Sequence, residues 1–133
     1  MSGVWNWQAL TAILVGGGVG SVLRYAVTVV LTQRFGPGFP WATFAINIAG
    51  SLIIGIVFEL SQTRAFGVTP IVRIFLMTGV LGGFTTFSTF SLDLVTLAAE
   101  RATLLALVYG AGSVVAGFVA AYAGIVAIRA LQP

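Results

Sequence analysis

The chain has 133 residues, of which 59% are hydrophobic and 7% charged, and its mean hydropathy is +1.09. Too little polar surface exists to coat a soluble globule, so the composition predicts an integral membrane protein. The absence of cysteine and histidine excludes thiolate chemistry, zinc sites built on these residues and histidine acid–base catalysis. The net charge of +3 rests on six scattered arginines and three acids. We therefore expect neither an enzyme nor a nucleic-acid-binding protein.

Four apolar segments follow one another along the chain, and each reaches the roughly 20 residues that a transmembrane helix needs. They cover residues 10–31, 41–60, 74–97 and 103–128. The connections are short, so sequential helices are expected to be antiparallel neighbours. The amino terminus has no basic region followed by a cleavage site, and we expect no signal peptide. The sequence predicts one all-α transmembrane domain that spans residues 1–133.

Small residues form stripes on the first and fourth predicted spans. The first stripe comprises Gly16, Gly17, Gly18, Gly20 and Ser21, and the second comprises Gly110, Ser113, Gly117, Ala121 and Gly124. Small side chains let helix backbones approach closely in a membrane, so we interpret both stripes as helix-packing surfaces. A dinucleotide-binding fingerprint is a poor alternative for the first stripe, because the spacing is wrong and no strand precedes it.

The third span carries two glycines and four hydroxyl residues in the middle of its apolar sequence. The segment reads Gly82-Gly83-Phe84-Thr85-Thr86-Phe87-Ser88-Thr89-Phe90. This pattern predicts that the helix is broken at Gly82 and Gly83. Backbone that leaves its helix within hydrocarbon is tolerated where it lines a cavity, binds an ion or is buried in protein.

Several other polar or aromatic residues lie inside the spans, where each polar group costs free energy unless it is satisfied. Thr43, Asn47 and Ser51 are expected on one helix face. Tyr109 is expected to share a face with Ser113, and Phe87 with Phe90. Arg24 lies well inside the first span. Taken singly, each fits a packing role. Together, hydrogen-bond donors, aromatic ring edges and an arginine favour a path for a small, hard anion, which neutral dipoles would bind without trapping.

The arginines are divided almost evenly between the two sides of the membrane. Arg64, Arg73 and Arg129 are expected on the side of the amino terminus, and Arg34 and Arg101 on the other. A bias of three against two is weak under the positive-inside rule, so it favours insertion in both orientations. Dual insertion is a precondition for an antiparallel homodimer. The alternative is that other determinants impose a single orientation.

Three segments of the chain resemble one known family. Residues 79–90 closely resemble the third-helix signature of the Fluc (CrcB) fluoride channels, and residues 16–25 and 43–50 are similar to its first-helix and second-helix motifs. The resemblance covers the whole chain in order. Ser21, Ala42 and Phe44 depart from the residues usual in the family, but none of these changes removes a donor group.

The resemblance implies a fold and a function. The expected fold is a dual-topology, antiparallel homodimer in the bacterial inner membrane. Its expected function is passive export of cytoplasmic fluoride through two pores, which confers fluoride resistance. The fluoride path implied by the resemblance is lined by Asn47, Phe87, Phe90, Tyr109, Ser113, Thr43, Ser88, Thr89 and Arg24. The same resemblance implies a structural sodium ion at the dimer centre, bound by main-chain carbonyls of Gly82 and Thr85.

Two other functions are compatible with four short helices. A small multidrug transporter has a carboxylate deep in its first helix, whereas this chain has Arg24 there. The acids Glu59, Asp93 and Glu100 are expected near helix ends, either solvated or paired. A passive anchor or assembly subunit is the second alternative, and it leaves the stripe of donors unexplained.

Overall fold

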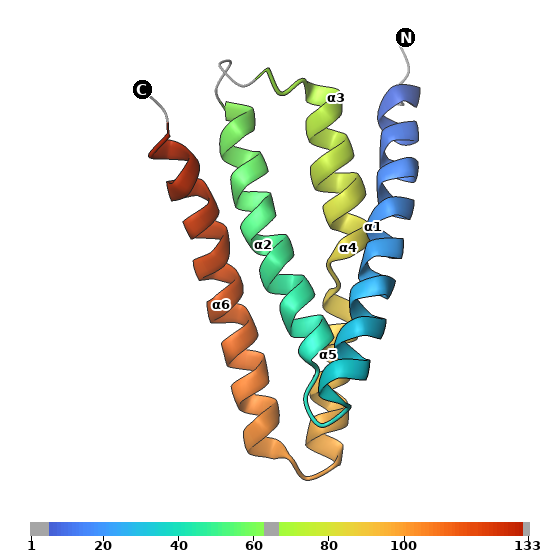
Figure 1. Ribbon diagram of the computed structural model, residues 1–133, viewed down its shortest axis with the longest axis vertical. Helices are drawn as coiled ribbons and strands as arrows, with labels where there is room; N and C mark the ends of the chain where they lie inside the picture. Colours follow the sequence, from blue (N-terminus) through green and yellow to red (C-terminus); the bar gives the residue numbers. More distant parts are fainter. Residues whose placement is uncertain (1–5, 63–66, 132–133) are drawn as a thin grey trace.

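The computed structural model describes residues 6–62 and 67–131, and every regular element in these ranges is a helix. Four helical segments are long and apolar enough to cross a membrane: α1 (Trp7–Phe35), α2 (Trp41–Gln62), a third segment over Pro70–Ala99, and α6 (Thr103–Arg129). Figure 1 shows that α1 begins and α6 ends at the same end of the bundle, which we call the terminal end. The α1–α2 and α5–α6 turns lie at the opposite, hairpin end.

The four predicted spans are confirmed, although their ends extend by up to four residues. Polar caps outside the apolar runs account for part of the extension. The side chain of Asn6 accepts hydrogen bonds from the amides of Gln8 and Ala9, so α1 begins at Trp7. Thr69 caps the third segment in the same way, with Pro70 at its first position.

The third segment consists of four consecutive pieces. It begins with α3 (Pro70–Arg73), continues as the π-helix η2 (Ile74–Leu81) and α4 (Gly82–Phe84), and resumes after a break as α5 (Phe87–Ala99). The break is confirmed, but its predicted position at Gly82 and Gly83 is wrong. Both glycines are helical, and the backbone becomes extended at Thr85 (φ −78°, ψ 160°) and Thr86 (φ −153°, ψ 118°). Figure 1 shows the irregular segment between α4 and α5.

Gly83, beside the break, and glycines of α1 allow the two segments to pack closely. A methyl group added to Gly83 would collide with the main-chain carbonyl of Gly17, and one added to Gly20 would collide with that of Val80. Side chains at these positions would force the two backbones apart. A methyl group on Gly16 would collide with the carbonyl of Phe75, so the predicted packing role of the first-span stripe holds at Gly16 and Gly20. It is wrong for Gly18, because a methyl group there would meet no atom within 4 Å.

The fourth-span stripe packs against α2. A methyl group on Gly124 would collide with the carbonyl of Leu52, and one on Gly55 of α2 would collide with the carbonyl of Ala121. The predicted backbone-to-backbone packing of the fourth span is therefore confirmed at Ala121 and Gly124. It joins α2 and α6 in their halves nearer the terminal end.

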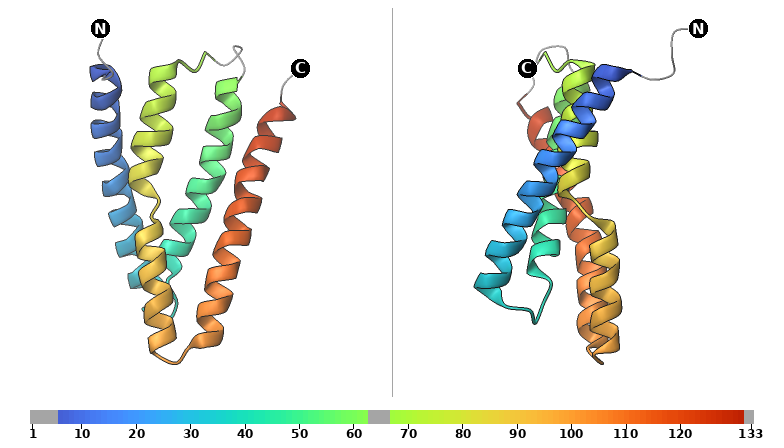
Figure 2. Two further views of the ribbon diagram at one scale, coloured as in Figure 1. Left: turned by 180° about the vertical axis from the view of Figure 1, so that it is seen from behind. Right: turned by 90° about the vertical axis from the view of Figure 1, so that its right-hand side faces the viewer.

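The α1–α2 pair and the α5–α6 pair diverge from each other toward the hairpin end, as Figure 2 shows. Aromatic side chains fill the space near this fork: the ring of Tyr109 is fully buried, with its centroid 5.4 Å from that of Phe39 and 5.3 Å from that of Phe90. This cluster links the loop before α2 to both helices of the other hairpin.

Candidate functional site in the broken third helix

An amide side chain from α2 caps the break. The Nδ2 of Asn47 donates to the carbonyl of Thr86 (3.1 Å), and its Oδ1 accepts from the amide of the same residue (2.9 Å). The side chain thus supplies both partners that the extended backbone of Thr86 needs in hydrocarbon. The Thr86 hydroxyl in turn accepts from the amide of Thr89 (3.2 Å) and begins α5 as its N-cap.

This capping changes the partners of two main-chain carbonyls. In a continuous α-helix the amide of Thr86 would bond to the carbonyl of Gly82, and the amide of Thr89 to that of Thr85. Both amides instead donate to the side-chain oxygens of Asn47 and Thr86. The carbonyls of Gly82 and Thr85, the two predicted sodium ligands, therefore lose their helical donors.

A cavity of about 390 Å³ lies beside the break. The predicted site residues that line it are Asn47, Gly82, Thr85, Phe87, Phe90 and Ser113. Ser51, from the predicted polar face of α2, lines it as well. The hydroxyl oxygen of Ser113 is buried and has no hydrogen-bond partner among the described residues, so it is a donor available to a ligand in this cavity. The structure thus brings together residues from α2, the third segment and α6.

The two phenylalanines share a face, as predicted, but their surroundings differ. Their ring centroids are 5.8 Å apart. Phe90 is half-buried against Tyr109, whereas 79% of Phe87 is exposed at the first turn of α5. The cavity is therefore bounded on the side of Phe87 by a ring that has few contacts within the chain.

Tyr109 lies behind Phe90, outside the lining of this cavity. Its hydroxyl donates to Oδ2 of Asp93 at 3.1 Å. Asp93 was expected near a helix end, which is wrong: it lies in the middle of α5, because that helix continues to Ala99. The hydrogen bond from Tyr109 satisfies one oxygen of this intramembrane carboxylate.

The other predicted path residues are dispersed. Thr43 and Thr89 line a separate cavity of about 400 Å³ at the hairpin end, together with Asp93 and Glu100. Ser88 is exposed and lies within 3.3 Å of the Thr86 hydroxyl. Arg24 is half-buried on α1 and lines none of the cavities identified in the described residues.

The site residue that the sequence analysis missed is Thr86, which connects Asn47 to the start of α5. The sequence signal for this role was a hydroxyl residue directly before the predicted helical residues that begin at Phe87, which is a typical N-cap position. No local sequence pattern indicated that Asn47 on α2 would be the partner of Thr86.

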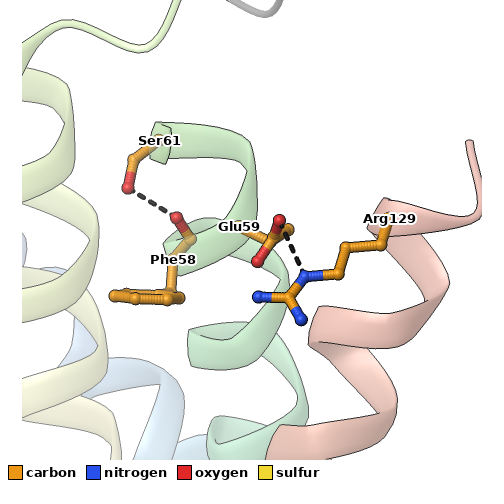
Figure 3. Close-up of polar contacts among 4 residues, drawn as sticks. All are labelled: Phe58, Glu59, Ser61 and Arg129. Carbon is orange, nitrogen blue, oxygen red and sulfur yellow. Dashed lines mark hydrogen bonds and ion pairs between the residues drawn. The ribbon is translucent and has the colours of Figure 1, made fainter. Parts of the chain in front are cut away.

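An ion pair closes the terminal end of the α2–α6 interface. Nε of Arg129 lies 3.0 Å from Oε1 of Glu59, as Figure 3 shows. Glu59 is only 5% exposed, and its Oε2 has no partner among the described residues. Its expected pairing near a helix end is confirmed. Arg64, which was expected on the side of the amino terminus, lies outside the described residues.

Comparison with known proteins identifies the family. Residues 11–125 match the family model described as CrcB-like protein, Camphor Resistance (CrcB). The chain belongs to the CrcB family. It is 46% identical over 116 residues to the "Fluoride-specific ion channel FluC" of Rhizobium meliloti (strain 1021), an alignment that covers 87% of this chain and 92% of the relative.

Other CrcB relatives show the same degree of similarity. The Chlorobium luteolum protein of the same name is 46% identical over 122 residues, which are 90% of this chain and 93% of that protein. The protein of this name from Rhizobium etli is 45% identical over 124 residues, covering 93% and 98%. The resemblance inferred from residues 16–25, 43–50 and 79–90 is thus confirmed. The chain is a multi-pass bacterial membrane protein of the CrcB family and not an enzyme.

Proposed function

We propose that this protein is a fluoride-selective channel that exports cytoplasmic fluoride passively and so confers fluoride resistance. The observation that carries this proposal is the cavity at the break, which gathers Asn47, Ser113 and the two phenylalanines. Relatives that align over most of the chain are named fluoride-specific ion channels. A hydroxyl, an amide and polarised ring edges suit a small anion that must give up water.

The active unit in this proposal is an antiparallel homodimer. Phe87, which lines the cavity, is largely exposed in the single chain, so a second copy would complete that wall. Among the described residues, Arg73 and Arg129 mark the terminal end, and Arg34 and Arg101 the hairpin end. Two arginines at each end give no strong preference for one orientation. A reporter on the carboxy terminus should therefore be detected on both faces of the membrane, and detection on one face alone would contradict the antiparallel arrangement.

A structural sodium ion completes the proposal. The carbonyls of Gly82 and Thr85 lack their helical donors, and sodium prefers such oxygen ligands. No group of three Asp, Glu, His or Cys side chains gathers in the described part of the chain, so a cation there would depend on main-chain oxygens. The bound ion would offset the partial negative charge of carbonyls from both copies.

Transport in liposomes tests the proposed function. Purified protein should pass fluoride and exclude chloride when a fluoride gradient alone is imposed. Phe90→Ile should reduce fluoride flux at least tenfold, because isoleucine keeps apolar bulk but lacks a polarised ring edge. Phe118→Ile is the matched control, since this exposed ring on α6 lines none of the cavities found in the described residues and its loss should leave flux unchanged. Equal passage of chloride would overturn the proposal.

The sodium ion is tested separately from transport coupling. Fluoride flux should proceed without a sodium gradient, whereas prolonged removal of sodium should lower the thermal stability of the dimer, because a ligand that binds only the folded state stabilises it. Unchanged stability after exhaustive sodium removal would contradict the site at Gly82 and Thr85. Flux that scales with the sodium gradient would instead indicate a coupled transporter.

A further inference from the structure

A second cavity is lined by residues from the end of α2 and from the start of the third segment, at the terminal end. It has a volume of about 440 Å³, and its lining includes Ser61, Arg73, Met77 and Thr78. The guanidinium carbon of Arg73 lies 5.9 Å from the ring centroid of Phe58, which holds the charge near the cavity wall. The lining found among the described residues contains this cation and no carboxylate.

Met77 joins this cavity to the one at the break. Its side chain lines both, and it lies on η2, the π-helical stretch between Arg73 and Gly82. Methionine is unbranched and flexible, so it can separate two spaces and also move aside. The two cavities are therefore neighbours with one adaptable side chain at their boundary.

The hairpin-end cavity has the opposite charge. Asp93 and Glu100 line it, and no arginine is among its described lining residues. A cavity with low-dielectric walls focuses the field of the charges that line it, so the terminal-end cavity should concentrate anions and the hairpin-end cavity should not.

We propose that the terminal-end cavity is the vestibule through which small inorganic anions reach the break, with Arg73 attracting them and Met77 forming the constriction. The inference rests on the proposed channel function and adds to it a vestibule and a constriction. Neither residue belongs to the polar faces of α2 and α6, because both lie on the third segment before the break.

Thiol chemistry tests the vestibule without reference to transport. The chain has no cysteine, so Thr78→Cys introduces a single thiol at the cavity wall. Its rates of modification by an anionic and a cationic methanethiosulfonate reagent are compared, with each reagent present on both sides of the vesicles. The anionic reagent should react faster by on the order of tenfold. Arg73→Gln should abolish this preference, and Arg73→Lys should restore most of it.

Ala130→Cys is the matched control. Ala130 is exposed at the same end of the bundle and follows Arg129, whose charge is paired with Glu59. The preference at this thiol should not change with Arg73→Gln. If Thr78→Cys does not fold, Ser61→Cys places the thiol on the α2 side of the same cavity. A thiol that neither reagent reaches, or equal rates for both reagents, would overturn the vestibule.

Flux measurements test the constriction. Met77→Phe should lower fluoride flux several-fold while the modification rates at Thr78→Cys stay the same, because the obstruction lies beyond the vestibule. Arg73→Gln should lower flux at low ionic strength and have less effect at high ionic strength, where salt screens the exposed guanidinium. Normal flux in both variants would overturn the vestibule, whereas absence of fluoride flux in the unmodified protein would overturn the channel itself.

Discussion

The two halves of the third membrane segment are held in different ways. Before the break, η2 and α4 touch α1 backbone to backbone through glycines such as Gly20 and Gly83. After it, α5 diverges from α1 and α2, as Figure 2 shows. It packs on α6 and is linked to α2 through the amide of Asn47. The first half depends on the absence of side-chain atoms, whereas the second depends on particular polar and aromatic groups.

This difference separates the residues that fix the position of the break from the residues that line the cavity. A helix face packed through glycines leaves no room for side chains between the two backbones, so it provides a fixed position for the break. A helix held by a few directed hydrogen bonds leaves space beside it, and that space is the cavity lined by Asn47, Phe87 and Phe90. Changes at the glycines packed against α1 should therefore affect folding most, and changes at the side chains that line the cavity should affect transport most.

The largest effect is expected from adding a methyl group to the packed glycine face. Gly20→Ala should destabilise the protein by about 3 kcal/mol or more, because the new carbon would collide with the Val80 carbonyl, which cannot move without shifting η2. Thermal unfolding in detergent micelles measures this change. Gly18→Ala on the same helix meets no atom within 4 Å and should be tolerated. Equal losses in the two variants would show that collision with η2 is not the cause.

A smaller loss of stability and a large loss of transport are expected at the link across the break. Asn47→Asp keeps an acceptor for the Thr86 amide but removes the donor to its carbonyl and adds a negative charge to the cavity. We expect a destabilisation of about 1–2 kcal/mol and fluoride flux close to zero. Asn6→Asp is the control, because aspartate caps a helix as well as asparagine does. Near-normal flux in Asn47→Asp would mean that this side chain only packs.

The smallest effect is expected behind the cavity. Tyr109→Phe keeps the buried ring but removes the hydrogen bond to Asp93, and it should cost about 1 kcal/mol of stability. Tyr122→Phe, at an exposed position on the same helix, should cost less than that. If Asp93→Asn in the Tyr109→Phe background adds as large a loss as it does alone, the two residues do not interact energetically.

Local patterns predicted several features of the site but not its assembly. The presence of a break followed from two glycines and four hydroxyls in one apolar run. Its position did not, because Gly83 is required for close contact with α1, whereas the extended backbone of Thr86 is satisfied by Asn47, 39 residues away. The pairing of Asp93 with Tyr109 is likewise a contact between helices, 16 residues apart in sequence.

The sequence alone determined the membrane environment, the number of spans, the small-residue packing faces and the family, because each depends on composition or on short motifs that act locally. The tertiary structure decided where the third helix breaks, which carbonyls lose their donors, and which polar residues share a cavity. It also placed Thr43 and Thr89 in the lining of a separate cavity and Arg73 beside a further one. These outcomes depend on which helix faces meet, and in a uniformly apolar chain close backbone packing selects those faces.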